Sequence, residues 1–425
     1  MLQAFRNIFK VSDLRHKILF TLVIILLYRL GCAIPSPGVN TAALADMVQE
    51  GGILQFLNLF SGGALSNLAI FGLGIMPYIT AAIIMEMLVA VIPKFKEWQE
   101  EGESGRKKIT QITRYMTLAL ALMQSIGLVY RFAQPMDGDA GPVYIVDFTW
   151  LKGLVIIVTL TAGMALLMWF GELITERGVG NGMSILIFIA IIARTPIELK
   201  TMITQTELRY GNIFYGIIIT VLMALAVIVA VIYLDQGERR IPVQYAKQIR
   251  GRRMTMGGQT YIPLKVNTSG VIPIIFASSV VFFPTMLAQF IPALEGFAQK
   301  IIEGWLYFVI YTFLIIFFAY FYTYIVFDPY TQAEHLKKYG AFVPGIRPGM
   351  PTATYFSKIL NRITLPGSIG LALVALLPAI LFYVYGTQQI PFGGAAIMII
   401  VGVALETMKQ IEAQLQMRHY EGFLR

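Results

Sequence analysis

The stretch 213-IFYGIIITVLMALAVIVAVIYL-234 decides the fold class of this chain, because none of its 22 residues carries a charge. A helix rises about 1.5 Å per residue, so a run of this length can cross the hydrocarbon core of a bilayer, about 30 Å thick. Inside lipid the backbone must satisfy its own hydrogen bonds, which an α-helix does within one segment. The stretch is therefore predicted to be a transmembrane helix.

Apolar runs of similar length recur along the whole chain. Of its 425 residues 57% are hydrophobic and 13% are charged, whereas about 25% of the residues in a soluble domain are charged. Period-two alternation is weak, which disfavours an outer-membrane barrel. The sequence thus predicts an all-α polytopic membrane protein with ten transmembrane helices. The expected spans are 18–34, 74–92, 111–130, 151–172, 182–194, 213–234, 270–292, 305–327, 366–385 and 391–408.

Lysine and arginine residues set the expected orientation. If the chain crosses the membrane ten times from a cytoplasmic N-terminus, 26 of its 33 basic residues fall on the cytoplasmic side and seven on the outer side. Basic residues in short loops favour the cytoplasm, so both termini are predicted to be cytoplasmic. The basic start with its apolar run has features of a signal peptide. However, Arg29 stands where a lipoprotein cleavage site before Cys32 would need an apolar residue, and no Ala-x-Ala cleavage site follows. We interpret 18–34 as a retained span.

Ten spans divide into two halves of five, which we place at 1–200 and 201–425. An odd number of spans makes the second half enter the membrane from the opposite side, as in an inverted repeat. A weak internal echo supports this: 74-GIMPYI-79 opens the second span and 270-GVIPII-275 opens the seventh. Glycine followed by proline also begins many unrelated membrane helices, so the echo alone leaves the repeat open.

Three segments between the spans are unusual. Residues 53–72 are apolar but contain paired glycines, so they form either a re-entrant plug or an interfacial helix, and composition leaves both open. The loop 235–269 contains two alternating stretches within 238–268 that predict a β-hairpin. The loop 328–365 contains 342-FVPGIRPG-349, a stretch that is expected to be extended and is punctuated by proline and glycine. Both loops are predicted to project into the cytoplasm as basic docking surfaces.

Motifs for enzymatic chemistry are lacking in the sequence. It has no Walker A pattern, HExxH, CxxC pair or GxSxG elbow, and its three histidines lie far apart. We expect no enzyme activity, no cofactor and no metal site. Glu86 is the one ionisable residue clearly within a span, whereas Arg29 is near an outer helix end and can reach water. This favours a passive conduit over two alternatives, an ion-coupled secondary transporter with inverted repeats and a structural membrane scaffold.

Six motifs in order along the chain carry a family resemblance. They are 58-NLFSGGALS-66, 74-GIMPYI-79, 101-EGESGR-106, 175-TERGVGNG-182, 263-PLKVN-267 and 340-GAFVPGIRPG-349. In this order they resemble the SecY family of protein-conducting channels along nearly the whole chain. The resemblance implies a clamshell of two five-helix halves with inverted pseudo-symmetry around an hourglass pore. It implies a channel that translocates unfolded secretory polypeptides across the membrane and releases transmembrane segments laterally into lipid.

The resemblance also implies a ring of apolar residues at the narrowest point of the pore. By motif position this pore ring consists of Ile75, Ile79, Met183, Ile187, Ile275 and Ile399. The spacing is compatible, because Ile75/Ile79 and Met183/Ile187 are i,i+4 pairs on one helix face. Met183 departs from the isoleucine that is frequent in the family, but methionine is flexible and apolar and should still seal.

Two gating elements follow from the same resemblance. The plug is expected at about 60–72, and its core residues are Phe60, Ser61, Gly62, Gly63, Ala64, Leu65, Ser66, Asn67 and Leu68. A lateral gate is expected between the second and third helices on one side and the seventh and eighth on the other. Its expected polar residues are Thr80, Gln124, Asn267 and Ser279. Ordinary helix-to-helix hydrogen bonding is an equal alternative for these four.

The resemblance finally implies partners and a location. Residues expected to contact a cytoplasmic motor or the ribosome are Arg239, Arg240, Lys247, Arg250, Arg252, Arg253 and Arg347. The family works with the small membrane subunits SecE and SecG and the SecA ATPase motor. Its other expected partners are the ribosome, signal sequences, nascent polypeptides and membrane lipid. The expected location is the cytoplasmic (inner) membrane, with a multi-pass topology and both termini in the cytoplasm.

Overall fold

The computed structural model contains ten helices of 16 residues or more within the residues that it describes. These residues are 12–49, 53–133, 144–145, 148–210, 213–245, 248–250, 253–255, 258–288, 296, 305–385 and 394–422. Each long helix overlaps one of the ten expected spans. The ten are α2 (Ser12–Ala33), α5 (Met76–Val91), α7 (Glu103–Ala133), α8 (Trp150–Arg177), α9 (Gly182–Tyr210), α10 (Ile213–Gln236), α11 (Ile272–Ala288), α13 (Trp305–Val326), α15 (Met350–Tyr385) and α16 (Gly394–Gly422).

Within the described part of the chain, five helical segments are long and apolar enough to cross a membrane. They are Ser12–Ala33, Glu103–Ala133, Trp150–Arg177, Trp305–Lys338 and Met350–Leu377. A sixth candidate is α5 followed by α6 (Pro93–Glu100), a pair bent by 97°. Shorter apolar helical stretches are Gly182–Ile197, Ala224–Gln236 and Ile272–Val281. Large apolar side chains such as Leu26 on α2 and Leu222 on α10 lie exposed on the surface of the protein. In a membrane such side chains face lipid tails, which are as apolar as leucine.

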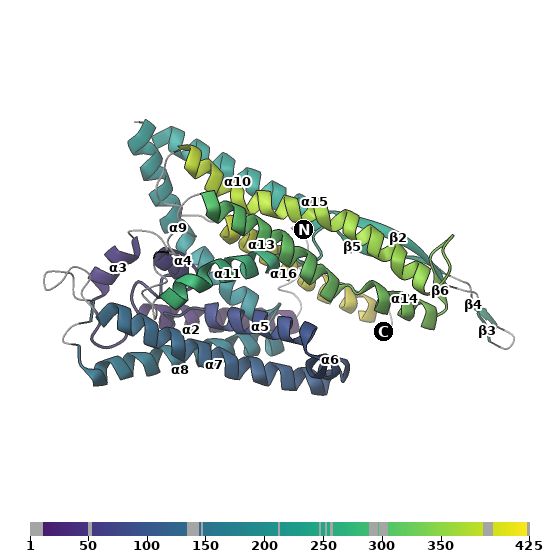
Figure 1. Ribbon diagram of the computed structural model, residues 1–425, viewed down its shortest axis with the longest axis horizontal. Coiled ribbons are helices and arrows are strands. Elements are labelled where there is room, and N and C mark those ends of the chain that lie inside the picture. Colours follow the sequence, from purple (N-terminus) through teal and green to yellow (C-terminus); the bar gives the residue numbers. More distant parts are fainter. Residues whose placement is uncertain are drawn as a thin grey trace.

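The helices form two groups that lie side by side along the long axis of the molecule (Figure 1). In the first group α5 packs on α7, α7 on α8 and α2 on α8. In the second group α11 packs on α13, α13 on α15, and α10 on both α15 and α16. Helix α9 contacts α8 of the first group and α10 and α16 of the second, while α5 touches α11. The two halves therefore meet along α9 and along the α5–α11 contact.

A small sheet extends from one end of the molecule (Figure 1). Strand β2 (Glu238–Tyr245) pairs antiparallel with β5 (Gln259–Lys265), and β6 (Ala341–Phe342) joins the other edge of β2. Strands β3 (Gln248–Arg250) and β4 (Arg253–Thr255) pair near the tip. The hairpin expected in 238–268 is confirmed. Its alternation has the predicted cause, because Ile241 and Val243 are buried between exposed neighbours.

Much of the expected loop 328–365 is helical, whereas its stretch 342–349 is not. Asp328 caps α14 (Pro329–Lys338) by accepting a hydrogen bond from the Tyr330 amide at 3.1 Å. Helix α15 then begins at Met350, well before residue 366, where the ninth span was expected to begin. The first turns of α15 are polar enough to look like a loop, but they bury Phe356 and Ile359 against the sheet. Only the segment around β6 is extended, so this packing overrides the loop-like composition.

Shorter elements lie at the opposite end from the sheet. Helix α3 (Thr41–Gln49) leads toward α4 (Ile53–Phe60), and a series of tight turns connects α4 to α5. This region contains the segment 53–72 that composition could not assign. It consists of one short helix followed by buried turns rather than one interfacial helix.

Candidate functional site

The six residues of the expected pore ring come from four helices that span both halves. Ile75 is the N-cap residue of α5 and Ile79 lies within it, while Met183 and Ile187 are on α9. Ile275 belongs to α11 and Ile399 to α16. All except Ile275 are buried members of one large apolar cluster, and Ile275 is half-buried against it. The fold therefore collects the six side chains in the same apolar interior.

The start of α5 is fixed by a close approach of two backbones. Gly74 has φ +59°, and a Cβ at this position would be 2.9 Å from the Cα of Ser61. Only glycine adopts this conformation without strain and leaves room for the neighbouring chain. Pro77 occupies the first turn of the helix, where the lack of an N–H has little cost. Ile75 and Ile79 are thereby oriented next to the segment that follows α4.

The expected plug is a compact set of turns held by its own side chains. The Ser61 hydroxyl donates to the Asn58 carbonyl at 3.1 Å and accepts from the Leu65 amide at 3.1 Å. The Asn58 side-chain oxygen accepts from the Ser66 amide at 3.0 Å. Leu65 and Leu68 are almost fully buried in a second apolar cluster with residues of α3, α7 and α8. These bonds replace the helical hydrogen bonds that the glycines interrupt.

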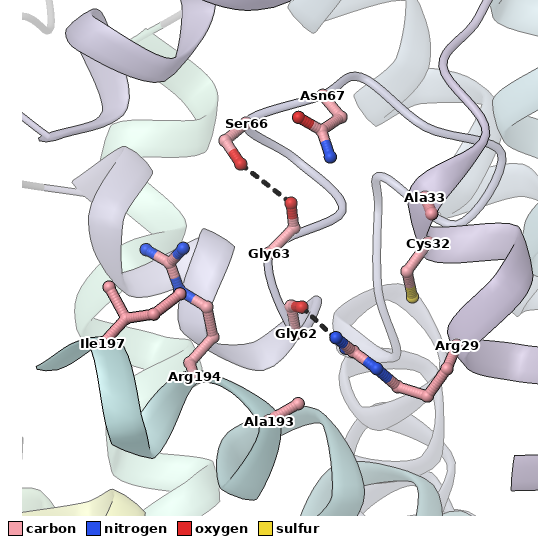
Figure 2. A pocket seen from close by; sticks show the side chains of 10 residues that line it. All are labelled: Arg29, Cys32, Ala33, Gly62, Gly63, Ser66, Asn67, Ala193, Arg194 and Ile197. Carbon is pink, nitrogen blue, oxygen red and sulfur yellow. Dashed lines mark hydrogen bonds between the residues drawn. The ribbon is translucent and has the colours of Figure 1, made fainter. Parts of the chain in front are cut away.

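Ser61, Gly62 and Gly63 form a turn that we call the glycine corner, of which Figure 2 shows Gly62 and Gly63. The Arg29 guanidinium of α2 donates to the Gly62 carbonyl at 2.9 Å, and the Tyr28 hydroxyl donates to the Ser61 carbonyl at 3.3 Å. On the opposite side, a Cβ on Gly62 would lie 3.1 Å from the Cα of Ala190 in α9. Helices α2 and α9 thus enclose the glycine corner from two sides.

Sequence reasoning missed the role of Arg29. Its position near a helix end suggested a side chain that reaches water, and its side chain is indeed partly exposed. Its guanidinium nevertheless turns to a carbonyl that is 33 residues away in sequence. The paired glycines at 62 and 63 were the available signal, because only a backbone without side chains lets an arginine approach this closely.

The four expected lateral-gate residues lie on α5, on α7, on α11 and just before α11, and each polar group that the structure shows bonded is satisfied locally. Thr80 of α5 donates to the Met76 carbonyl at 3.0 Å. Ser279 of α11 donates to the Ile275 carbonyl at 2.9 Å, and the Asn267 amide donates to the Gly270 carbonyl at 3.1 Å. Gln124 is buried on α7. Among the described residues, therefore, neither Thr80 nor Ser279 makes a hydrogen bond between α5 and α11.

The hairpin presents basic side chains to solvent. Arg239 and Arg240 are exposed on β2. Arg240 donates to the Glu238 carboxylate at 2.7 Å and lies 4.9 Å from the ring centre of Tyr261, and the bond to Glu238 raises the pKa of Arg240. Arg250 and Arg253 are paired across β3 and β4. Lys247 and Arg252 lie outside the described residues.

Arg347 belongs to the same end of the molecule. It is exposed between β6 and α15, and its carbonyl accepts from the Thr352 hydroxyl at 2.8 Å. This bond fixes the turn that precedes α15. The expected basic surface is therefore assembled from two loops that are distant in sequence.

Two charged features lie among the helices of the first half. Arg114 of α7 makes a two-pronged ion pair with Glu172 of α8, with N–O distances of 2.6 and 2.8 Å. Glu86 of α5 has one carboxylate oxygen, Oε2, that is buried without a hydrogen-bond partner. No group of three or more metal-binding side chains occurs among the described residues.

Comparisons with known proteins agree with this architecture. The chain is 50% identical to the protein translocase subunit SecY of Streptomyces scabiei and 48% identical to that of Mycobacterium tuberculosis strain H37Rv, with full coverage of both chains in each case. The fold matches the solved structure of a protein-conducting channel with a TM-score of 0.64 at 18% identity, covering 94% of this chain and 92% of that chain. It also matches Sec61 in the canine ribosome–channel complex from the endoplasmic reticulum, with a TM-score of 0.62, 17% identity and the same coverage.

These findings settle the fold class and the broad function. The fold is the ten-helix clamshell of two five-helix halves, and such relatives give no support to a secondary transporter. Family membership makes the chain a channel subunit rather than an enzyme. The SecY family model matches residues 69–408. The chain therefore belongs to the SecY family of protein-conducting channels.

Proposed function

We propose that secretory polypeptides cross the membrane through the pore ring of Ile75, Ile79, Met183, Ile187, Ile275 and Ile399. The observation that carries this proposal is their common apolar cluster, to which four helices from both halves contribute. Apolar side chains have no fixed hydrogen bonds to break, so they can yield to many different peptide side chains. When the pore is idle, an apolar constriction excludes water and ions.

The segment 60–72 acts as the plug in this proposal. In its core, Phe60 to Leu68, the residues Phe60 and Ala64 are buried in the same apolar cluster as Ile75, and the core would close the pore from the side of α4. Its ties to the helices include the hydrogen bonds from Tyr28 and Arg29 to the glycine corner. A few bonds of this kind can be exchanged for water when a polypeptide enters.

The lateral gate lies between α5 and α7 of the first half and α11 and α13 of the second. Thr80, Gln124, Asn267 and Ser279 give its faces a polar character, and Thr80, Asn267 and Ser279 bond within their own segments. Opening this contact therefore breaks few bonds between the halves. An apolar signal sequence gains free energy by leaving the pore here for lipid.

The hairpin, Arg347 and the tip strands form a docking surface for the SecA motor or the ribosome. Arg239, Arg240, Lys247, Arg250, Arg252 and Arg253 supply its positive charge, which suits an acidic partner or ribosomal RNA. A ribosome-bound Sec61 channel with the same fold supports the ribosome as a partner. SecE and SecG complete the channel in the membrane.

We further place the chain in the inner membrane, with both termini and the hairpin in the cytoplasm. The charge asymmetry of the loops supports this orientation. The halves are proposed as 1–200 and 201–425. Helix α9 continues through residue 200 to Tyr210, so this boundary falls within the last turns of the helix.

Crosslinking tests the pore. In a Cys32→Ser background, Ile79→Cys should crosslink to a stalled secretory chain that carries a signal sequence. The matched control is Val221→Cys, on an exposed face of α10. A substrate without its signal sequence should give no product at either site. Crosslinking at Val221→Cys alone, in an assembled complex, would contradict the pore ring.

A further inference from the structure

Glu86 of α5 is a half-buried acid that the proposed function leaves without a role. Its carboxylate oxygen Oε2 is buried and has no hydrogen-bond partner, and no cation among the described residues balances its charge. Arg114 is not available to Glu86, because it already binds both carboxylate oxygens of Glu172. A buried charge is costly unless a partner of opposite charge is supplied. Glu86 is therefore suited to a cation that comes from outside the chain.

Glu86 shares a helix face with the pore ring. It follows Ile79 by seven residues and Ile75 by eleven, which are close to two and three turns of about 3.6 residues, so it lies on their side of α5, about 10 Å beyond Ile79. The start of α5 lies against the plug, where Gly74 approaches Ser61, and α6 at its other end lies away from α3 and α4 (Figure 1). Glu86 is thus on the side of the ring away from the plug, which is the cytoplasmic side in the proposed orientation.

Residues of the second half lie near Glu86. The Tyr322 hydroxyl of α13 is close enough to Glu86 and to Glu406 of α16 to interact with both negative charges. The Tyr322 ring packs edge-on against Phe276 of α11, with 6.3 Å between the ring centres. Helix α11 also touches α5. Glu86 therefore borders the contact between α5 and α11, where the lateral gate is proposed.

Glu406 adds negative charge on the same side of the pore ring. It follows Ile399 by seven residues, so it lies nearly on the face of α16 that carries this ring residue. Lys409, one turn further on, donates to Asp235 at 2.9 Å, so its charge is paired with another carboxylate. With no cation paired to either glutamate among the described residues, this part of the pore favours a positively charged ligand over a negatively charged one.

We propose that Glu86 binds a basic side chain of the entering polypeptide, at the flank of its apolar stretch, and so selects signal sequences with a basic flank. A signal sequence carries a positively charged segment before its apolar stretch. When the apolar stretch lies between α5 and α11, the basic segment lies further along α5, at the level of Glu86. A lysine or arginine there donates a charge-assisted hydrogen bond to the carboxylate. This inference rests on the proposed lateral gate and orientation.

Changing the charge on the channel and on the substrate together tests the inference. The reconstituted complex translocates a reporter whose signal sequence has either lysines or glutamines before its apolar stretch. Glu86→Gln should lower translocation of the lysine signal about ten-fold at limiting substrate, as expected for the loss of one charge-assisted bond. It should leave the glutamine signal unchanged. Glu86→Lys should reverse the preference and favour a signal with aspartates at this flank.

The matched control is Glu97→Gln, on an exposed position of α6. It should change translocation of neither signal. Anionic lipids and the membrane potential also act on a basic flank, but they act alike on the Glu86 and Glu97 variants. A difference between the two variants therefore belongs to Glu86.

Two outcomes would overturn the inference. An equal loss of translocation for both signals would give Glu86 a structural role only, and unchanged translocation of both would give it none. If Glu86→Gln does not assemble, Glu86→Leu removes the same carboxylate and should give the same result. Crosslinking in a Cys32→Ser background separates the lateral gate from Glu86. If the lysine signal crosslinks at Thr80→Cys whether or not Glu86 is replaced, this inference alone fails. If it does not crosslink there even with Glu86 present, the proposed lateral gate fails too.

Discussion

At the hairpin, Arg239 and Arg240 extend from a regular strand into solvent, whereas at the glycine corner Arg29 donates to a backbone carbonyl 33 residues away. The hairpin arginines owe their place to alternation along β2, with Ile241 and Val243 turned inward. The place of Arg29 depends on a bend that only two glycines permit. The hairpin is thus a surface on a scaffold with its own core, and the glycine corner is an irregular structure held by contacts between distant segments.

The largest expected effect tests the independence of the hairpin. Ile241 is about 1% exposed and packs in the small core with Leu264 and Phe356. Ile241→Ala should destabilise this unit by about 2–5 kcal/mol, because it removes buried methyl groups and leaves a cavity. Hydrogen exchange should then speed up in β2 and β5 but not in α5 or α9. Thr260→Ala, on an exposed position of β5, is the control. Faster exchange throughout the helices would show that the hairpin is not a separate unit.

The hairpin is also the part that local patterns predict best. Alternation predicted its strands, and long apolar runs predicted all ten long helices, since both signals are short-range. The start of α15 at Met350 was not predicted, because its polar first turns are held by burial of Phe356 on the sheet. Two-residue spacing and helical faces carry no information about such distant contacts.

The glycine corner shows the same limit at the candidate site. The pairs Ile75/Ile79 and Met183/Ile187 could be placed on common helix faces, but only the family resemblance singled them out among many apolar pairs. The bonds from Tyr28 and Arg29 to the glycine corner had no signal beyond the glycines themselves. The pairing of Arg114 with Glu172 likewise depends on how α7 packs on α8.

The second prediction concerns the close approach at Gly74. Gly74→Ala should cost about 2–3 kcal/mol, because it combines a left-handed backbone with a Cβ 2.9 Å from the Cα of Ser61. The strain should displace the glycine corner and raise the resting ion conductance of the reconstituted complex. Gly102→Ala is the matched control, since Gly102 also has φ of +79° but nothing within 4 Å of its Cβ position. Equal conductance in the two variants would show that the close contact between Gly74 and Ser61 does not keep the resting channel closed.

The third prediction compares the two kinds of arginine directly. Arg29→Gln should weaken the hold on the Gly62 carbonyl by about 1.5 kcal/mol, the lower end for a bond from a charged donor. The population of open channels at rest should then rise about ten-fold. Single-channel recording measures this population. Arg239→Gln, on the exposed strand, should leave the population of open channels unchanged. A similar rise with Arg239→Gln would show that the effect of Arg29→Gln is not specific to the glycine corner.

The smallest expected effect returns to the hairpin surface. Arg240 is exposed and already paired with Glu238, and its guanidinium lies over Tyr261. Arg240→Gln should therefore weaken ribosome binding to proteoliposomes only about two- to five-fold, as expected for one exposed charge. The loss should shrink as salt rises, because solvent-exposed charges are screened at higher ionic strength. Arg240→Lys keeps the charge but not the flat stacking group, so recovery by this variant assigns the effect to charge. If binding by the lysine variant stays low at every salt concentration, the contact at Tyr261 shapes the docking surface, and the hairpin depends on specific geometry in the way that the glycine corner does.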